Sequence, residues 1–124
     1  MKFLLVIQGD EAAQAKATPA DRERVFAAYR EYTESMNAAG VRRGGEALMP
    51  SARGAKVQIR GEKKSVVDGP FAEAREVVGG YYLIDVPSRD EAIAWAERCP
   101  GAHFGTIEVR EVVSLDYNQA MKQG

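Results

Sequence analysis

Residues 66–71 read VVDGPF, a hydrophobic strand that runs directly into an Asp-Gly-Pro turn, and residues 77–86 read VVGGYYLIDV, a second apolar strand. Short apolar runs bounded by Gly, Pro and Asp are typical of buried strands. We therefore predict that both lie at the centre of a sheet. Side chains alternate along a strand, so Tyr81 and Tyr82 are expected to face opposite sides.

Start and stop signals place two helices outside these strands. The first begins at Thr18, a hydroxyl cap followed by a proline and an acid, and ends at Gly40. The second begins at Ser88 with a capping box and is halted by Pro100-Gly101. Apolar runs and alternating patterns predict the strands: residues 2–8, 41–49, 55–60, 65–68, 77–86 and 106–113. We expect the polar tail, residues 114–124, to fray or to pack on a neighbour.

The predicted order is β-α-β, an inserted hairpin with one solvated face, then β-α-β. This is the split βαβ pattern of a ferredoxin-like α+β fold, in a single domain over residues 1–124. Two helices can cover only one face of such a sheet, whereas strand 77–86 carries apolar side chains on both. We therefore predict a symmetric homodimer in which a second copy covers the other face.

Charge and composition narrow the classes of partner. The chain has 17 basic and 18 acidic residues, so no strong field attracts nucleic acid or an anionic membrane. The apolar run after Lys2 is too short for a signal peptide or a membrane span, and the single cysteine, Cys99, agrees with a cytoplasmic protein. The sequence has one histidine and no pair of cysteines, which argues against a zinc site. It also lacks a glycine-rich phosphate-binding loop, so we assign no cofactor.

Five blocks in the same order resemble the DGPF-domain group of the YCII-related family: residues 9–11, 44–46, 68–71, 79–84 and 107–110. The resemblance implies a bacterial protein with a dimeric α+β-barrel fold. Genes of this group often lie beside those of extracytoplasmic-function sigma factors, which implies a regulatory partner. Relatives are proposed to be enzymes because a histidine and an aspartate share a cleft. Tyr29 stands at the place of that histidine, and His103 lies in a loop elsewhere, so the pair is not carried over.

Three residues are candidates for catalysis, each with a structural alternative. Asp68 ends a strand and can project into a cleft, or it can cap its own Asp-Gly-Pro turn as an Asx-type residue. Glu46 follows two glycines that permit close approach of a ligand, or it is a solvated acid beside a bulge. Tyr29 can act as a general acid, or it packs in the core with its hydroxyl at the edge.

Three further residues are candidates for ligand binding. Asp10 follows the first strand and is otherwise an ordinary surface acid of a loop. Tyr81 lines a shared cleft if its side of the strand faces the partner copy. Arg110 can hold an anionic group, or it pairs with Glu108 on the surface.

Two functions therefore remain open from the sequence. In the first, a homodimer binds a small polar molecule in a cleft built from Asp68, Glu46, Tyr29 and Arg110. The carboxylates there serve either as binding groups or as the general acid and base of an enzyme. In the second, the protein is a non-catalytic accessory that dimerises and engages a sigma factor. The grouping of acids and tyrosines around one expected cleft favours the first.

Overall fold

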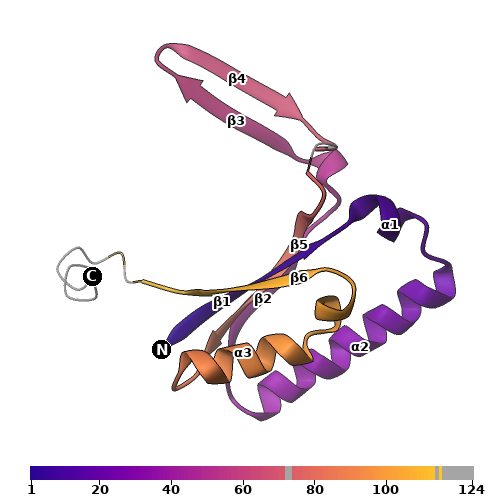
Figure 1. The fold of residues 1–124 in the computed structure, drawn as a ribbon, viewed down its shortest axis with the longest axis vertical. Helices are drawn as coiled ribbons and strands as arrows, with labels where there is room; N and C mark the ends of the chain where they lie inside the picture. Colours follow the sequence, from indigo (N-terminus) through magenta and orange to yellow (C-terminus); the bar gives the residue numbers. More distant parts are fainter. Residues whose placement is uncertain (72–73, 114, 116–124) are drawn as a thin grey trace.

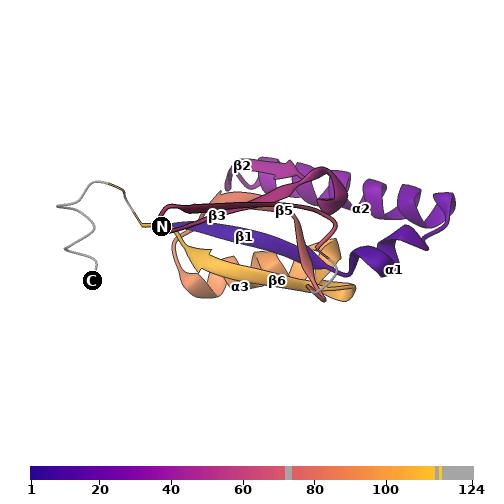
Figure 2. The same ribbon diagram turned by 90° about the horizontal axis from the view of Figure 1, so that it is seen from above.

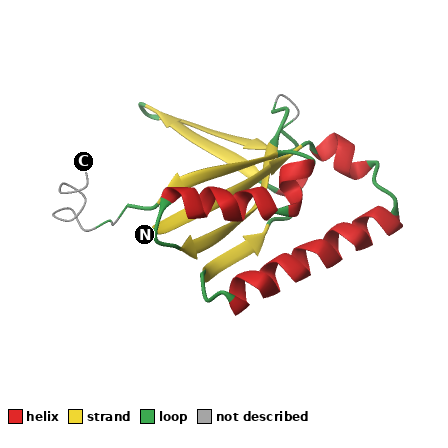
Figure 3. Cartoon of the chain, turned by 60° about the horizontal axis from the view of Figure 1, so that its bottom comes forward, coloured by secondary structure: helices red, strands yellow, loops and turns green. Residues whose placement is uncertain are grey.

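The computed structural model describes residues 1–71, 74–113 and 115, and it is an α+β protein. Four antiparallel strands form one sheet in the order β2-β5-β1-β6, with β2 and β6 at its edges. Two helices, α2 and α3, lie along one side of this sheet (Figures 1 and 3). The elements of the sheet and its helices are β1 (Lys2–Gly9), α2 (Pro19–Ala38), β2 (Arg42–Ala47), β5 (Val77–Asp85), α3 (Arg89–Arg98) and β6 (Thr106–Glu111).

The connections confirm the two interleaved βαβ units. Helix α2 joins β1 to β2 with β5 between them, and α3 joins β5 to β6 with β1 between them. The edges of the sheet do not pair with each other, so a single chain does not close into a barrel within the described residues. Among those residues, none of the helices is long and apolar enough to cross a membrane.

The predicted helix caps are confirmed, as a full capping box at Thr18 and as the serine half of one at Ser88. The Thr18 hydroxyl accepts a hydrogen bond from the Asp21 amide at 3.1 Å, and the Asp21 carboxylate accepts one from the Thr18 amide at 3.3 Å. This reciprocal pair fixes the first turn of α2. Gly40 follows its last turn with φ +71°, a conformation that favours glycine. In α3 the Ser88 hydroxyl accepts from the Glu91 amide at 3.2 Å.

One core lies between the helices and the sheet. Tyr32 and Met36 of α2 are buried on the predicted stripe, and Tyr82 beside them donates to or accepts from the Thr33 hydroxyl at 2.7 Å. The Tyr32 hydroxyl donates to the Trp95 carbonyl of α3 at 2.7 Å, which joins the two helices. The buried apolar residues of this core are Phe3, Leu5, Tyr32, Met36, Ile84, Val86, Ala92, Ala96 and Cys99.

The apolar character of residues 66–71 predicted that they lie at the centre of the sheet. The structure shows that this prediction is wrong. These residues end a separate two-stranded hairpin, β3 (Ala55–Arg60) and β4 (Lys63–Asp68), which pairs only with itself. Helices α2 and α3 lie below the sheet in Figure 1 and the hairpin rises above it, and Figure 2 shows the hairpin over the same strands. Every residue of both strands is exposed, so the prediction of only one solvated face is wrong for the single chain.

The loop predicted after the first strand is instead a short helix, α1 (Glu11–Ala15). A short 3-10 turn, η1 (Ser51–Arg53), precedes the hairpin, and another, η2 (Pro100–His103), follows α3. The predicted tail, residues 114–124, lies outside the described residues except for Leu115. Both 3-10 turns escaped the sequence analysis because their apolar pattern is too short to show a period.

Candidate functional site

The candidate site is the face of the sheet that the helices leave open. Tyr82 points toward α2, so its neighbours Tyr81 and Leu83 point to the opposite side. Strand pairing aligns four residues in one row across that side: Glu46 of β2, Tyr81 of β5, Val6 of β1 and Glu108 of β6. The next row is Gly44, Leu83, Leu4 and Arg110. We call these eight residues the open face.

The middle of the open face is apolar and its ends are charged. Leu4, Val6, Tyr81 and Leu83 are half-buried by their neighbours within the sheet. Glu46 is exposed at the β2 edge. At the β6 edge the Arg110 Nη1 lies 3.6 Å from the Glu108 carboxylate, and these side chains are 71% and 45% exposed, so salt weakens the pair.

Glycines let β2 approach β5 closely beside Glu46. A methyl group at Gly80 would lie 2.8 Å from the Glu46 carbonyl oxygen, and one at Gly45 would lie 2.9 Å from the Tyr81 carbonyl oxygen. The pairing shifts register between Arg42 and Gly44, which confirms the predicted irregularity. The Glu46 carboxylate and the Tyr81 phenol consequently share one side of adjacent strands, with Cβ atoms about 5 Å apart as in any directly opposed pair.

Tyr29 lies on the other side of the sheet from these residues. It packs against the core from α2, and its hydroxyl accepts a long contact of 3.8 Å from the Cys99 thiol. Burial, and secondarily the neighbouring thiol, raise the pKa of the Tyr29 phenol above its usual value of 10. Burial also raises the pKa of the Cys99 thiol. Tyr29 and Glu46 therefore do not meet in one site within a chain.

Asp10 and Asp68 also stand apart from the open face. The Asp10 carboxylate caps α1, accepting from the amides of Ala12 at 2.9 Å and Ala13 at 3.1 Å. Asp68 ends β4 opposite Ala55 and is exposed. No hydrogen bond to its carboxylate is seen within residues 1–71, 74–113 and 115, so the Asx-type turn considered for it is not observed there.

A contact that sequence reasoning missed joins α1 to the base of the hairpin. The Glu11 carboxylate accepts from the Ser51 amide at 2.7 Å and also from its hydroxyl. These bonds, the one to the hydroxyl first, lower the pKa of Glu11 below its usual 4.5. The Phe71 amide in turn donates to the Ser51 hydroxyl at 3.4 Å. No local pattern could have indicated it, because 40 residues separate Glu11 from Ser51.

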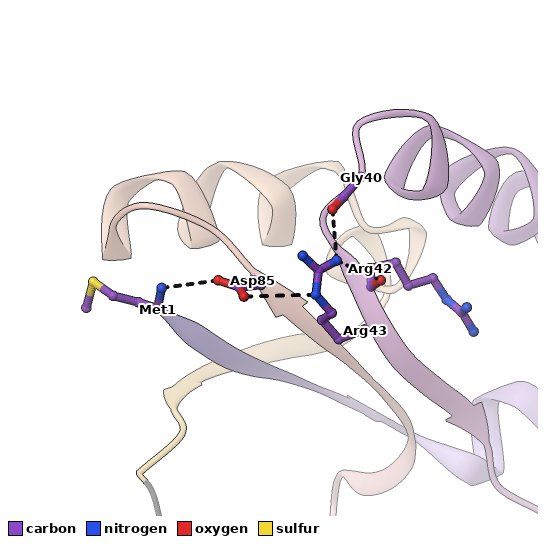
Figure 4. Close-up of polar contacts among 5 residues, drawn as sticks. All are labelled: Met1, Gly40, Arg42, Arg43 and Asp85. Atoms are coloured by element: carbon purple, nitrogen blue, oxygen red, sulfur yellow. Dashed lines mark hydrogen bonds and ion pairs between the residues drawn. The ribbon is translucent and has the colours of Figure 1, made fainter. Parts of the chain in front are cut away.

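A group of charged residues around Asp85 lies where β5 ends and β2 begins (Figure 4). Asp85 accepts from the Met1 amino group at 3.2 Å, and the Arg43 Nε lies 3.9 Å from its other oxygen. The bond from the amino group lowers the pKa of Asp85. Arg43 also donates to the Gly40 carbonyl at 2.8 Å. Asp85 and Arg43 thus hold the end of β5 beside the start of β2.

The structure thus places three of the six predicted site residues, Glu46, Tyr81 and Arg110, on one side of the sheet, with Glu46 and Arg110 on its opposite edge strands, and places the other three elsewhere. It adds Glu108 to the open face. The alternation of residues along the last strand predicts a polar side for Glu108, but only the strand pairing shows that this residue lies in the same row as Tyr81. Carboxylate, phenol and guanidinium groups together accept and donate hydrogen bonds and balance either charge. Within the described part of the chain, no cluster of three or more His, Cys, Asp or Glu side chains is arranged to hold a metal ion.

Comparison with known proteins agrees with the five sequence blocks. The model of the YCII-related domain matches residues 1–116. An uncharacterised protein of Rhizobium meliloti (strain 1021) is 33% identical over 116 residues, a match that covers 89% of this chain and 90% of the relative. The chain belongs to the YCII-related family.

Proposed function

We propose that two copies of this ferredoxin-like chain stack their open faces into a dimeric α+β barrel and bind a small polar molecule between them. The observation that supports the proposal is the row Glu46, Tyr81, Val6 and Glu108, where an apolar centre lies between charged ends on a face without helices. Ligand sites of this kind combine apolar walls with a few polar groups that fix orientation.

The dimer follows from the apolar centre. Leu4, Val6, Leu83 and Tyr81 are contiguous across two paired strands, and the helices cover only the reverse side of both. A contiguous apolar patch on an otherwise charged chain marks an interaction surface. A two-fold axis through the open face places each copy's patch against the same patch of its partner.

The ligand class follows from the polar ends. Glu46 attracts an amine or a hydroxyl donor, Arg110 attracts a carboxylate or another anion, and Tyr81 offers a hydroxyl that donates or accepts. In a two-fold dimer each group occurs twice. A small molecule that carries both a donor and an acidic group fits this set, and Glu46 and Tyr81 are the groups able to exchange a proton with it.

The dimer is tested by sedimentation velocity over a wide range of protein concentration. We expect the wild type to sediment at twice the chain mass and Leu83→Glu to sediment as a folded monomer, because a charge at the centre of an apolar interface is costly to bury. The matched control is Ala94→Glu on α3, which is exposed. A wild type that stays monomeric at every concentration contradicts the dimer.

The site is tested by a thermal-shift screen against small carboxylates, amines, phenols and amino acids. A true ligand raises the melting temperature in proportion to its concentration. The shift should shrink in Glu46→Gln, Tyr81→Phe and Arg110→Gln, and it should persist in Glu31→Gln, an exposed position on α2. A ligand whose shift is the same in all four variants binds elsewhere and contradicts the assigned site.

A further inference from the structure

One side of the hairpin of β3 and β4 is mainly apolar, with Lys64 and Asp68 at its two ends, and the other side carries three of the four basic residues of the hairpin. Val57 lies directly opposite Val66, and Ile59 and Ala55 lie two residues away on the same strand, so these four share one side. We call them the hairpin patch. Val57, Ile59 and Val66 are 61%, 63% and 52% exposed, which is high for β-branched apolar residues. The reverse side carries Lys56, Gln58, Arg60, Lys63, Ser65 and Val67.

The hairpin forms a two-stranded sheet of its own, and hydrogen bonds hold its base. The Gly69 amide donates to the Gly54 carbonyl at 2.9 Å, and the Gly54 amide donates to the Ser51 carbonyl at 2.9 Å. The Lys56 ammonium group lies 4.3 Å from the centre of the Phe71 ring. An isolated two-stranded hairpin is marginally stable in water, so the hairpin patch needs a surface to pack on.

The position of the hairpin indicates which surface that is. It rises on the same side of the sheet as the open face, opposite the helices (Figures 1 and 2). Strands of six residues reach about 20 Å from the base. A second copy stacked on the open face therefore stands within reach of the hairpin, so the interface continues from one surface onto the other.

Charge favours the same occupant. Residues 55–68 carry four basic and two acidic side chains, whereas the rest of the chain carries 13 basic and 16 acidic ones. The hairpin is thus positive and the body of the chain is negative. A second copy of this chain presents an acidic body to a basic arm, and two-fold symmetry repeats the contact.

We propose that the hairpin is an arm that packs the hairpin patch on the body of the partner copy. The proposal rests on the stacked dimer of the preceding subsection and extends it: each chain holds its partner by the open face and by the arm. The arms add apolar burial at two symmetric places, and Lys64, which lies opposite Ile59 on the side of the hairpin patch, meets the acidic body of the partner.

A pair of neighbouring substitutions tests the arm with charge held constant. Val57→Glu places a carboxylate on the hairpin patch, and Gln58→Glu places the same charge on the reverse side of the same strand. Both positions are exposed in the single chain, so both variants should keep the circular dichroism spectrum of the wild type. We expect Val57→Glu to raise the dissociation constant of the dimer about tenfold or more and Gln58→Glu less than about threefold.

The outcomes separate the arm from the dimer. Equal dissociation constants for Val57→Glu and Gln58→Glu, with Leu83→Glu still monomeric, overturn the arm and leave the stacked dimer standing. A monomeric wild type overturns both. If Val57→Glu lowers the melting temperature of the Leu83→Glu monomer more than Gln58→Glu does, the hairpin patch packs on its own chain, and the proposal is also wrong.

Crosslinking gives an independent reading of the occupant. A benzoylphenylalanine at Ile59 should, on irradiation of the purified protein, give a species of twice the chain mass, with the attachment point in the partner body. The same group at Glu31 on α2 is the control and should not. Crosslinks from position 59 that stay within one chain, or that form only after a different protein is added, overturn the proposal.

Discussion

The Glu11 carboxylate binds both the amide and the hydroxyl of Ser51, and so ties the helix after the first strand to the base of the hairpin. Ser51 is buried, and its carbonyl also accepts from Gly54. This contact sets where the hairpin leaves the body of the chain, so it is the first one to test.

Glu11→Gln should lower the melting temperature at neutral pH, because it replaces a carboxylate that accepts two bonds. The folded pKa of Glu11 is below the unfolded value of 4.5, so the stabilisation is complete above the unfolded pKa and is lost as pH falls through the folded one. Melts followed by circular dichroism should show a difference from wild type that disappears under acid conditions. Glu23→Gln, an exposed acid on α2, is the control and should show no such difference.

Gly69→Ala should destabilise the protein by about 1–3 kcal/mol, because a methyl group there would overlap the Ser51 carbonyl oxygen. A methyl group at Gly79 meets no described atom within 4 Å, so Gly79→Ala should be nearly neutral. Urea denaturation of the two variants measures the difference. If both cost the same, the hairpin base moves freely enough to make room.

Tyr32→Phe should cost about 1–3 kcal/mol, because it leaves the half-buried Trp95 carbonyl without the Tyr32 hydroxyl as donor. Tyr29→Phe removes a long contact from the Cys99 thiol and should cost less. Chemical denaturation at neutral pH compares them. Since Tyr29 lies behind the sheet, its variant should also keep the thermal shift of any ligand of the open face, and loss of that shift would return Tyr29 to the site.

Cys99 should resist a thiol reagent in the folded protein and react promptly in denaturant. It is fully buried, and burial raises its pKa, so less of it is thiolate at neutral pH than in a free cysteine. Timed reaction with a chromogenic disulfide reagent measures this. Prompt labelling of the native protein would mean that α3 opens readily from the sheet.

The sequence predicted the elements better than it predicted their neighbours. The hydroxyl caps at Thr18 and Ser88 and the glycine at Gly40 are local signals, and each marks a helix end as expected. Residues 66–68 are as apolar as a central strand, yet they lie in an exposed hairpin, because apolar character shows the need for burial and not the surface that provides it.

The candidate site shows the same limit. Glu46, Tyr81 and Arg110 come from three strands, and only the pairing register places them on one side of the sheet. Asp10 was chosen for its position after a strand, and its carboxylate caps the next helix. The cytoplasmic location and the sigma-factor partner stay predictions.

The ladder between β2 and β5 continues past the end of β2, where the Leu48 amide donates to the Gly79 carbonyl at 2.9 Å. The segment that contains the hairpin therefore begins and ends beside one cross-strand pair, Leu48 and Gly79. A shorter connection in place of residues 50–76 would leave β2, β5 and the other strands of the main sheet intact. The arm is therefore an insertion that the fold tolerates, and its cost falls on kinetics: β2 and β5 must find each other across a long loop, which slows folding compared with a direct turn.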